Sequence, residues 1–276
     1  MFNQAITEPQ PVVPACSDSF FFLRFAIAES TMLIGQIGYP QYNIIAAIAT
    51  PEGELYSTSD PSRLCPGHWK CWVASAEGER FEVIWWPVQP KAIPIEHKNL
   101  VLRATVYIDG VEVEQGILKP RDWLAGRHGW INGQQADSST LRHFQWGSRE
   151  LLDDKNKPKK KIDPKNLNTI RVVVEWGTQP RLRTRKIPIA QRNWSPVRAR
   201  PSDIKFDNMS AATLGDSSPH KADPRRPPFR PAPGLNPRTF LFQYASEDWI
   251  ETQGIVLKDH ASDEPIFPKE PKYTKR

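Results

Sequence analysis

Apolar residues alternate with polar ones most regularly between Leu100 and Ile108. Leu102, Ala104, Val106 and Ile108 fall on one face of an extended chain, since side chains alternate across a strand with a period of two. The run stops at Asp109-Gly110, a dipeptide suited to the positive φ angles of a tight turn, and Val111 and Val113 continue the pattern. The sequence therefore predicts a β-hairpin centred on residues 109–110.

Similar runs occur along much of the chain. Residues 69–75 and 81–86 flank a Gly-containing turn at 76–79 and predict a second hairpin, and residues 42–49 and 55–56 flank the turn 50–54 and predict a third. Further strands are expected at 144–146, 170–176 and 240–244. Ser246 is suited to cap a short helix that Gly254 would close.

Two stretches give other expectations. Glycines and polar residues between 121 and 140 predict a long loop. Residues 20–33 combine aromatic residues, which favour a strand, with Ala26, Ala28 and Glu29, which favour a helix. A helix is preferred there, and the strand remains the alternative.

Short strands separated by turns predict a mainly β fold, an antiparallel β-sandwich or jelly-roll-like single domain with a short C-terminal helix. We expect residues 19–179 and 239–257 to form this domain. Residues 1–18 and 258–276 lack periodicity and are expected to be disordered tails.

The interval 180–238 separates the last predicted strand from the others. It holds 11 prolines and 13 Lys and Arg against 4 acidic residues. So little apolar surface would not offset the entropy of ordering the chain. We expect a disordered, basic insertion that loops out between two core strands, which closure entropy permits because that entropy grows only slowly with length.

Charge and cysteine content bear on the compartment. The chain carries 37 Lys and Arg against 31 Asp and Glu; residues 1–150 have 12 against 16, whereas residues 151–276 have 25 against 15. Three cysteines are too few for a disulfide framework, and the N-terminus lacks a basic signal-peptide region. The apolar stretch 20–34 is interrupted by charge and too short to span a bilayer. An intracellular protein, cytoplasmic or nuclear and not secreted, is predicted, without a membrane role.

These landmarks resemble an uncharacterised domain family of unknown function that is widespread in mushroom-forming fungi. The order and spacing of several short segments carry the resemblance: Cys71-Trp72-Val73 with Ser75, Gly78, Phe81 and Val83; residues 106–110; Phe144 and Trp146; and residues 151–154, 167–174, 240–244 and 254–256. The resemblance covers about residues 42–256. It implies a β-sandwich core and supplies no catalytic residues.

The spacing of Cys65, His68 and Cys71 could offer two thiolates and an imidazole to a zinc ion. A fourth ligand is missing, and Cys71 falls on an inward strand position where a thiol packs well. The same residues could form a cysteine–histidine nucleophilic pair, but no third group orients the base. Packing of Cys71 is the preferred interpretation, and no metal or cofactor is assigned.

A charge-rich stretch follows residue 152. Asp153 and Asp154 could act as paired carboxylates, although their neighbours favour a solvated turn. Lys157, Lys159, Lys160 and Lys161 form a basic cluster of the kind that nuclear import receptors and phosphates bind. Ordinary loop composition is the competing interpretation.

The 10 tryptophans suggest a carbohydrate platform, and Trp85-Trp86 is the notable pair. Neighbouring strand residues point to opposite faces, so one indole would lie in the core and the other nearer the surface.

No constellation of residues specifies a reaction. The preferred hypothesis is therefore a non-enzymatic interaction or binding module with an unknown protein partner. One alternative is a nucleic-acid-associated nuclear protein that uses the basic insertion, and another is a hydrolase or lectin-like domain with a Trp-lined groove.

Overall fold

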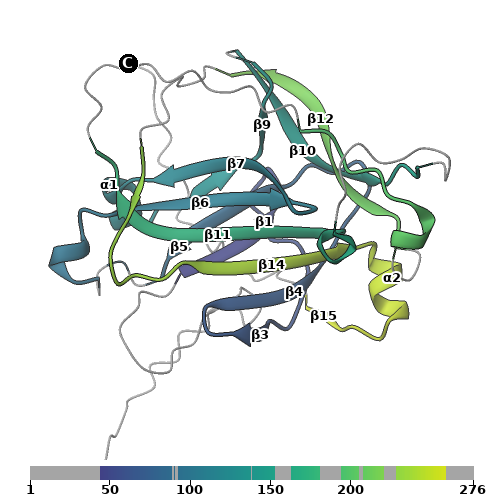
Figure 1. Ribbon diagram of the computed structural model, residues 1–276, viewed down its shortest axis with the longest axis horizontal. Helices are drawn as coiled ribbons and strands as arrows, with labels where there is room; N and C mark the ends of the chain where they lie inside the picture. The colour runs from purple at the N-terminus through teal and green to yellow at the C-terminus, as the bar shows by residue number, and fades with distance from the viewer. Residues whose placement is uncertain are drawn as a thin grey trace, which may run out of the picture.

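A computed structural model describes residues 44–88, 90, 93–137, 139–152, 163–180, 194–204, 208–220 and 228–258. These residues form a mainly β protein with three sheets and two short α-helices (Figure 1). The predicted fold class is confirmed in this respect. The predictions for residues 1–18, 20–33 and 259–276 fall outside the described residues.

The largest sheet has nine strands. Its main order is β15-β2-β4-β14-β11-β6-β7, with β3 beside β4 and β13 beside β11. The strands are β2 (Thr58–Ser59), β3 (Ser62–Cys65), β4 (His68–Ala74), β6 (Val101–Ile108), β7 (Val111–Leu118), β11 (Thr169–Thr178), β13 (Arg230–Pro231), β14 (Arg238–Ala245) and β15 (Leu257–Lys258). Strands β14 and β4 are parallel, and the other named pairs in the described part of the chain are antiparallel.

Two three-stranded sheets complete the fold. One has the order β1-β5-β8, from β1 (Ile44–Ala49), β5 (Glu82–Pro87) and β8 (Gly129–Ile131); the other has the order β12-β10-β9, from β12 (Ser210–Pro219), β10 (Thr140–Ser148) and β9 (Gly133–Gln135). Backbone hydrogen bonds connect them, since Phe81 N donates to Phe144 O at 3.2 Å and Phe144 N donates to Asn132 O at 3.0 Å. In Figure 1, β1 and β5 lie behind β6, β11 and β14 of the large sheet.

One hydrophobic core joins the large sheet to the two smaller ones. The inward residues of β6 are Leu102, Ala104, Val106 and Ile108, all fully buried, as their alternation predicted. The smaller sheets contribute apolar residues that include Ile44, Ile48, Val83, Trp85, Phe144 and Trp146. Because both layers bury side chains in the same core, the sheets form a sandwich.

The hairpin at residues 109–110 is confirmed. Asp109 and Gly110 have φ angles of 49° and 79°, and they connect the antiparallel strands β6 and β7. Asn and Asp adopt positive φ more readily than most other residues, which explains this dipeptide at the turn.

The last predicted strand, β14, is confirmed as a central strand. It pairs with β11 on one side and with β4 on the other. Phe240, Phe242 and Tyr244 are at most 1% exposed and belong to the common core. The short helix that follows is α2 (Glu247–Thr252), where Ser246 Oγ accepts a hydrogen bond from Trp249 N and Gly254 has a φ of 69°.

The hairpin predicted for residues 69–75 and 81–86 is wrong in its pairing. Strands β4 and β5 both form, but they belong to different sheets. Gly78 N donates to Trp146 O, and Trp146 N donates to Glu79 O, so the turn between β4 and β5 pairs with β10 while the chain crosses from one layer to the other. The hairpin predicted around the turn 50–54 is confirmed, since Ala49 and Leu55 form an antiparallel bridge and Tyr56 N donates to Ile48 O at 3.1 Å. Strand β1 also pairs with β5 along its whole length.

The predicted loop at 121–140 is also wrong. Helix α1 (Pro120–Leu124) and strands β8 and β9 occupy much of it. Trp123 is fully buried, and its indole N–H donates to Leu100 O. A Cβ on Gly129 would overlap the indole of Trp85, so this glycine permits close packing inside a strand and does not mark a turn.

The interval 180–238 is not a disordered insertion in its described parts. Strand β12 runs along β10 for most of its length, and β13 pairs with β11. Trp194, Val197 and Ala199 are buried. A strand can gain order from the backbone ladder of its neighbour even where its own apolar content is low. Residues 181–193, 205–207 and 221–227 lie outside the described residues, and Lys258 of the predicted C-terminal tail belongs to β15.

Short 3-10 helices complete the described elements. They are η2 (Ile95–His97), η3 (Pro164–Asn166) and η4 (Pro201–Asp203). The last two lie beside the pocket described next.

Candidate functional site

A pocket of about 340 Å³ opens on the outer side of the large sheet, next to α2. Its lining comes from five parts of the chain that are distant in sequence. The lining residues are Lys70, Trp72, Pro164, Leu167, Asn168, Asp203, Asn208, Gln243, Trp249, Gln253 and Ile255. The volume is at the lower end of the range for small-molecule sites.

The sheet supplies the floor of the pocket. Cys71 and Val73 of β4 point into the core, so Lys70 and Trp72 point outward. Gln243 of β14 is the direct cross-strand neighbour of Trp72. The parallel pairing of β14 with β4 therefore sets an indole beside a primary amide.

Helix α2 supplies one wall. Fully buried Ile250 anchors the helix against the core. Trp249 and Gln253 are one helical turn apart and therefore lie on the same side of the helix. The rings of Trp249 and Trp72 have their centroids 5.2 Å apart and their planes tilted by 40°. The two indoles thus contact each other and form a continuous aromatic surface.

The opposite wall comes from the segments around η3 and η4. Leu167 packs with Val197 and Ala199 in a small apolar cluster, which holds these segments together. Asn168 has a φ of 58°, a conformation that asparagine tolerates better than most residues. Asp203 ends η4 and is partly exposed.

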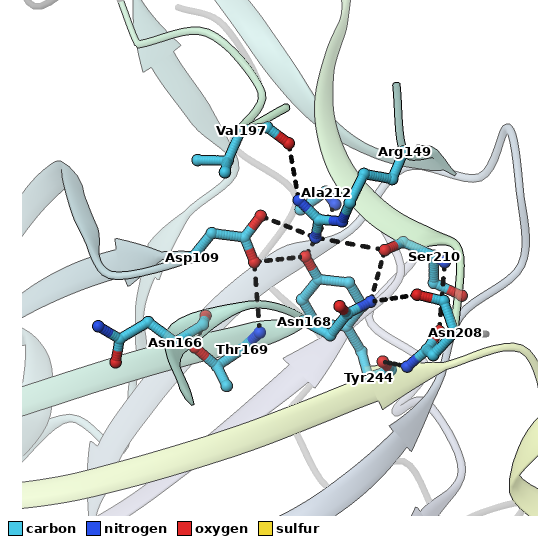
Figure 2. Close-up of polar contacts among 10 residues, drawn as sticks. All are labelled: Asp109, Arg149, Asn166, Asn168, Thr169, Val197, Asn208, Ser210, Ala212 and Tyr244. Carbon is cyan, nitrogen blue, oxygen red and sulfur yellow. Dashed lines mark hydrogen bonds and ion pairs between the residues drawn. The ribbon is translucent and has the colours of Figure 1, made fainter. Parts of the chain in front are cut away.

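A buried polar network supports this wall (Figure 2). The Arg149 guanidinium lies 2.9 Å from the Asp109 carboxylate, and both side chains are fully buried. The Tyr244 hydroxyl donates to Asp109 at 3.0 Å and accepts from Ala212 N at 3.1 Å. Arg149 also donates to Val197 O at 2.7 Å. The network therefore ties β14, β12 and the segment before η4 to the turn between β6 and β7.

Two asparagines connect the network to the pocket. Asn168 Nδ2 donates to Ser210 O at 2.6 Å, and Asn208 Nδ2 donates to Tyr244 O at 3.0 Å. Asn208 Oδ1 in turn accepts from Ser210 N at 3.2 Å. These bonds fix the two side chains, so this part of the lining is preorganised.

Burial and charge shift the pKa values in the network. Burial raises the pKa of the Asp109 carboxyl, against the lowering effect of the Arg149 charge. Burial by itself would lower the pKa of Arg149, but the Asp109 carboxylate reverses this and raises it. Burial and the nearby Asp109 charge raise the pKa of the Tyr244 hydroxyl. The network is therefore a structural ion pair with a neutral tyrosine.

Other polar groups of the pocket lack a side-chain partner among the described residues. Gln243 Oε1 is buried and has no hydrogen-bond partner in the described part of the protein. Within the same residues, Lys70 and Asp203 form no side-chain ion pair. An unpaired buried acceptor is costly, and a ligand that donates to it would remove that cost.

Cys65, His68 and Cys71 do not converge. Cys65 and His68 are exposed cross-strand partners on β3 and β4, whereas Cys71 is 3% exposed and points into the core, where burial raises its thiol pKa. The predicted packing of Cys71 is confirmed. Among the described residues no group of three His, Cys, Asp or Glu side chains could hold a metal ion.

Several predicted residues cannot be placed. Asp153, Asp154, Lys157, Lys159, Lys160 and Lys161 lie outside the described residues. The predictions attached to them therefore remain predictions.

The tryptophans of the pocket differ from the predicted pair. Trp85 is 1% exposed in the core, while Trp86 is half-buried and packs with Ala47 and Ile84. From the sequence alone, Trp72 is identified only as a landmark of the family resemblance, and Trp249 is not identified at all. Trp72 could have been found from its position between Cys71 and Val73, because two inward neighbours on a strand require an outward residue between them.

Comparisons with known proteins give no match: no family model, no curated protein and no solved structure is similar to this chain. Within the described ranges, neither α-helix nor any 3-10 helix has the length and apolar character to cross a bilayer.

Proposed function

We propose that the protein is a non-enzymatic binding module that holds a small polar ligand in the pocket beside Trp72 and Trp249. The observation that carries the proposal is the combination of a continuous indole surface with Gln243 Oε1, which is buried and unpaired among the described residues. Lys70 and Asp203 add one cation and one anion to the same pocket. Apolar surface with a few convergent polar groups is typical of ligand sites.

Binding without turnover fits the chemistry of the lining better than catalysis does. Among the described lining residues Asp203 is the one carboxylate, and the lining includes no His, Ser, Thr, Tyr or Cys. A glycosidase mechanism requires two carboxylates, and covalent catalysis requires a nucleophile with a base. The described pocket therefore lacks the paired carboxylates of a glycosidase and a hydroxyl or thiol nucleophile.

The rigid support of the pocket also favours binding. Asn168 and Asn208 are fixed by hydrogen bonds to β12 and β14, and these strands are tied to Arg149 and Asp109. A site held in its binding conformation loses less entropy when a ligand binds.

An intracellular location, cytoplasmic or nuclear, agrees with this proposal. Cys65 and Cys71 are free thiols, and Cys65 is exposed. Exposed free thiols persist in reducing compartments. The resemblance to an uncharacterised fungal domain family is compatible with a β-sandwich binding module and adds no more specific activity.

A screen with chemically distinct probes tests the proposed function. We would measure thermal unfolding with neutral sugars, nucleosides, quaternary amines and N-acetylated amino-acid amides, using wild type, Trp249→Ala and Trp130→Ala. Trp130 is the matched control because it is 57% exposed on β8, in the other layer of the sandwich. At least one class of probe should raise the melting temperature of wild type and of Trp130→Ala but not that of Trp249→Ala, since a ligand stabilises the state that binds it. The proposal is wrong if no class does so.

A further inference from the structure

We infer that the ligand is a neutral sugar that lies with one C–H face on the indole surface of Trp72 and Trp249 and is hydrogen-bonded by Gln243, Lys70 and Asp203. This inference rests on the proposed function and narrows it to a ligand class. The geometry of the indoles, the charge balance of the lining and the pattern of hydrogen-bonding groups support it in turn.

The spacing of the indoles excludes a flat ring inserted between them. Favourable carbon–carbon contacts are about 3.5–4.0 Å, so an intercalated base would need roughly 7–8 Å between the two rings. The centroids of Trp72 and Trp249 are 5.2 Å apart. A ligand that stacks on these indoles therefore lies on the outside of the pair, as the apolar face of a saturated ring can.

The charges of the described lining disfavour charged ligands. Lys70 would repel the quaternary amines that aromatic cages bind. Asp203 would repel phosphates and carboxylates, and the described lining residues include no arginine to form a bidentate pair with them. One positive and one negative side chain balance the charge of the described lining, which suits a neutral molecule.

The polar groups match hydroxyls in particular. A hydroxyl both donates and accepts. It can donate to Asp203 and can accept from Lys70 Nζ, whereas the side-chain amides of Gln243 and Gln253 are groups that both donate and accept. A molecule with several hydroxyls and an apolar face satisfies this mixed set, and a volume of about 340 Å³ fits a mono- or disaccharide at the lower end of ligand-site sizes.

Calorimetric titration of the full chain tests the inference. The probes are glucose, galactose, mannose, N-acetylglucosamine, maltose and cellobiose, with glucose 6-phosphate, choline and adenosine as chemical comparisons. We expect at least one neutral sugar to bind. Its affinity should fall at least about tenfold in Gln243→Met, which keeps the side-chain volume and removes the acceptor, since that loss corresponds to one hydrogen bond.

Two controls make the result specific. Trp130→Ala should bind the sugar as wild type does, because its indole lies outside the pocket. Affinity for a neutral sugar should also stay the same between low and high salt, whereas binding of a charged ligand would change through screening. Thermal unfolding of each variant shows whether it is folded.

The failures are distinguishable. If only glucose 6-phosphate, choline or adenosine binds, and Gln243→Met or Trp249→Ala weakens that binding, the sugar class is wrong and the binding module stands. If a sugar binds equally well to Gln243→Met and Trp249→Ala, the sugar site lies elsewhere and the inference is wrong. If none of these probes binds, the inference is wrong, and if the N-acetylated amino-acid amides also fail to bind, the proposed function is wrong as well.

Discussion

The ion pair between Arg149 and Asp109 is the residue-level feature on which the pocket wall depends. Both side chains are fully buried, and Tyr244 and Thr169 N donate to Asp109 as well. Removal of one partner from a buried pair leaves an uncompensated charge. We expect Arg149→Met to lower the free energy of unfolding by about 3–5 kcal/mol in urea denaturation.

A surface pair provides the control for this prediction. Arg198 and Glu150 are 2.7 Å apart, but their side chains are 63% and 69% exposed. Arg198→Met should change stability by no more than about 0.5 kcal/mol, as surface substitutions do. Equal losses in the two variants would contradict the structural role of the buried pair. The double variant Asp109→Asn/Arg149→Met should recover part of the loss, since no buried charge remains.

The stability of the single variant Arg149→Met should depend on pH. Burial raises the pKa of Asp109, and the Arg149 charge is the largest influence that lowers it, so removal of Arg149 moves the pKa further up. A carboxyl with a raised folded-state pKa contributes stability below its unfolded value of about 3.9 and loses it as pH rises through the folded value. The deficit of Arg149→Met relative to wild type should therefore grow from acid towards neutral pH in urea denaturation at several pH values. A deficit that is constant with pH would show that Asp109 is not left charged and buried.

At the scale of elements, β14 is central to the large sheet. Phe242 of this strand is 1% exposed, and replacement of a buried aromatic residue leaves a cavity. Phe242→Ala should cost about 3–5 kcal/mol of unfolding free energy. Val256→Ala, at a residue that is 77% exposed, is the control and should be nearly neutral. A loss below roughly 0.5 kcal/mol for Phe242→Ala would place this residue outside the core.

Deletion of β14 tests its position more severely. A chain that ends at residue 236 lacks the strand between β4 and β11, so both neighbours gain an unpaired edge. Unpaired edges invite association with other chains. Light scattering should show aggregation of the truncated protein. A monomer with the melting temperature of the full chain would mean that β14 contributes nothing to the sandwich.

Elements with strong alternation could be predicted from the sequence, and so could the hairpin of β6 and β7, but the pairing of strands distant in sequence could not. Residues 100–108 and 240–244 alternate strictly and form β6 and β14. A glycine-containing turn such as 76–79 has the same sequence pattern whether it joins neighbouring strands of one sheet or connects strands of different layers. Strand β12 is rich in Ala, Ser and Thr, so its order depends on β10 and has no local apolar signal.

The pocket could not be predicted because it exists only in the folded molecule. Its floor, walls and network come from residues around 70, 168, 203 and 243–255, and no local motif joins them. The outward position of Trp72 could be predicted from the alternation along its strand. That Gln243 lies beside Trp72 follows only from the parallel pairing of β14 with β4. Prediction failed where the information is in the packing of distant segments.

At the scale of the whole molecule, the sandwich carries the pocket on the outer face of the large sheet, and β12 of the other layer supports its wall. The chain has 10 tryptophans, and only Trp72 and Trp249 are among the described lining residues. Every indole N–H gives its own signal in a nitrogen–proton correlation spectrum. Ligand binding can therefore be located within the intact protein.

The most direct measurement is a titration of the nitrogen-15-labelled protein with the neutral mono- and disaccharides named above. The indole signals are assigned with Trp72→Phe, Trp249→Phe and Trp130→Phe. We predict that one of the sugars shifts the signals of Trp72 and Trp249 in a saturable way and leaves that of Trp130 unchanged. Shifts centred on Trp130, or unchanged signals of Trp72 and Trp249 with every sugar, would contradict the account.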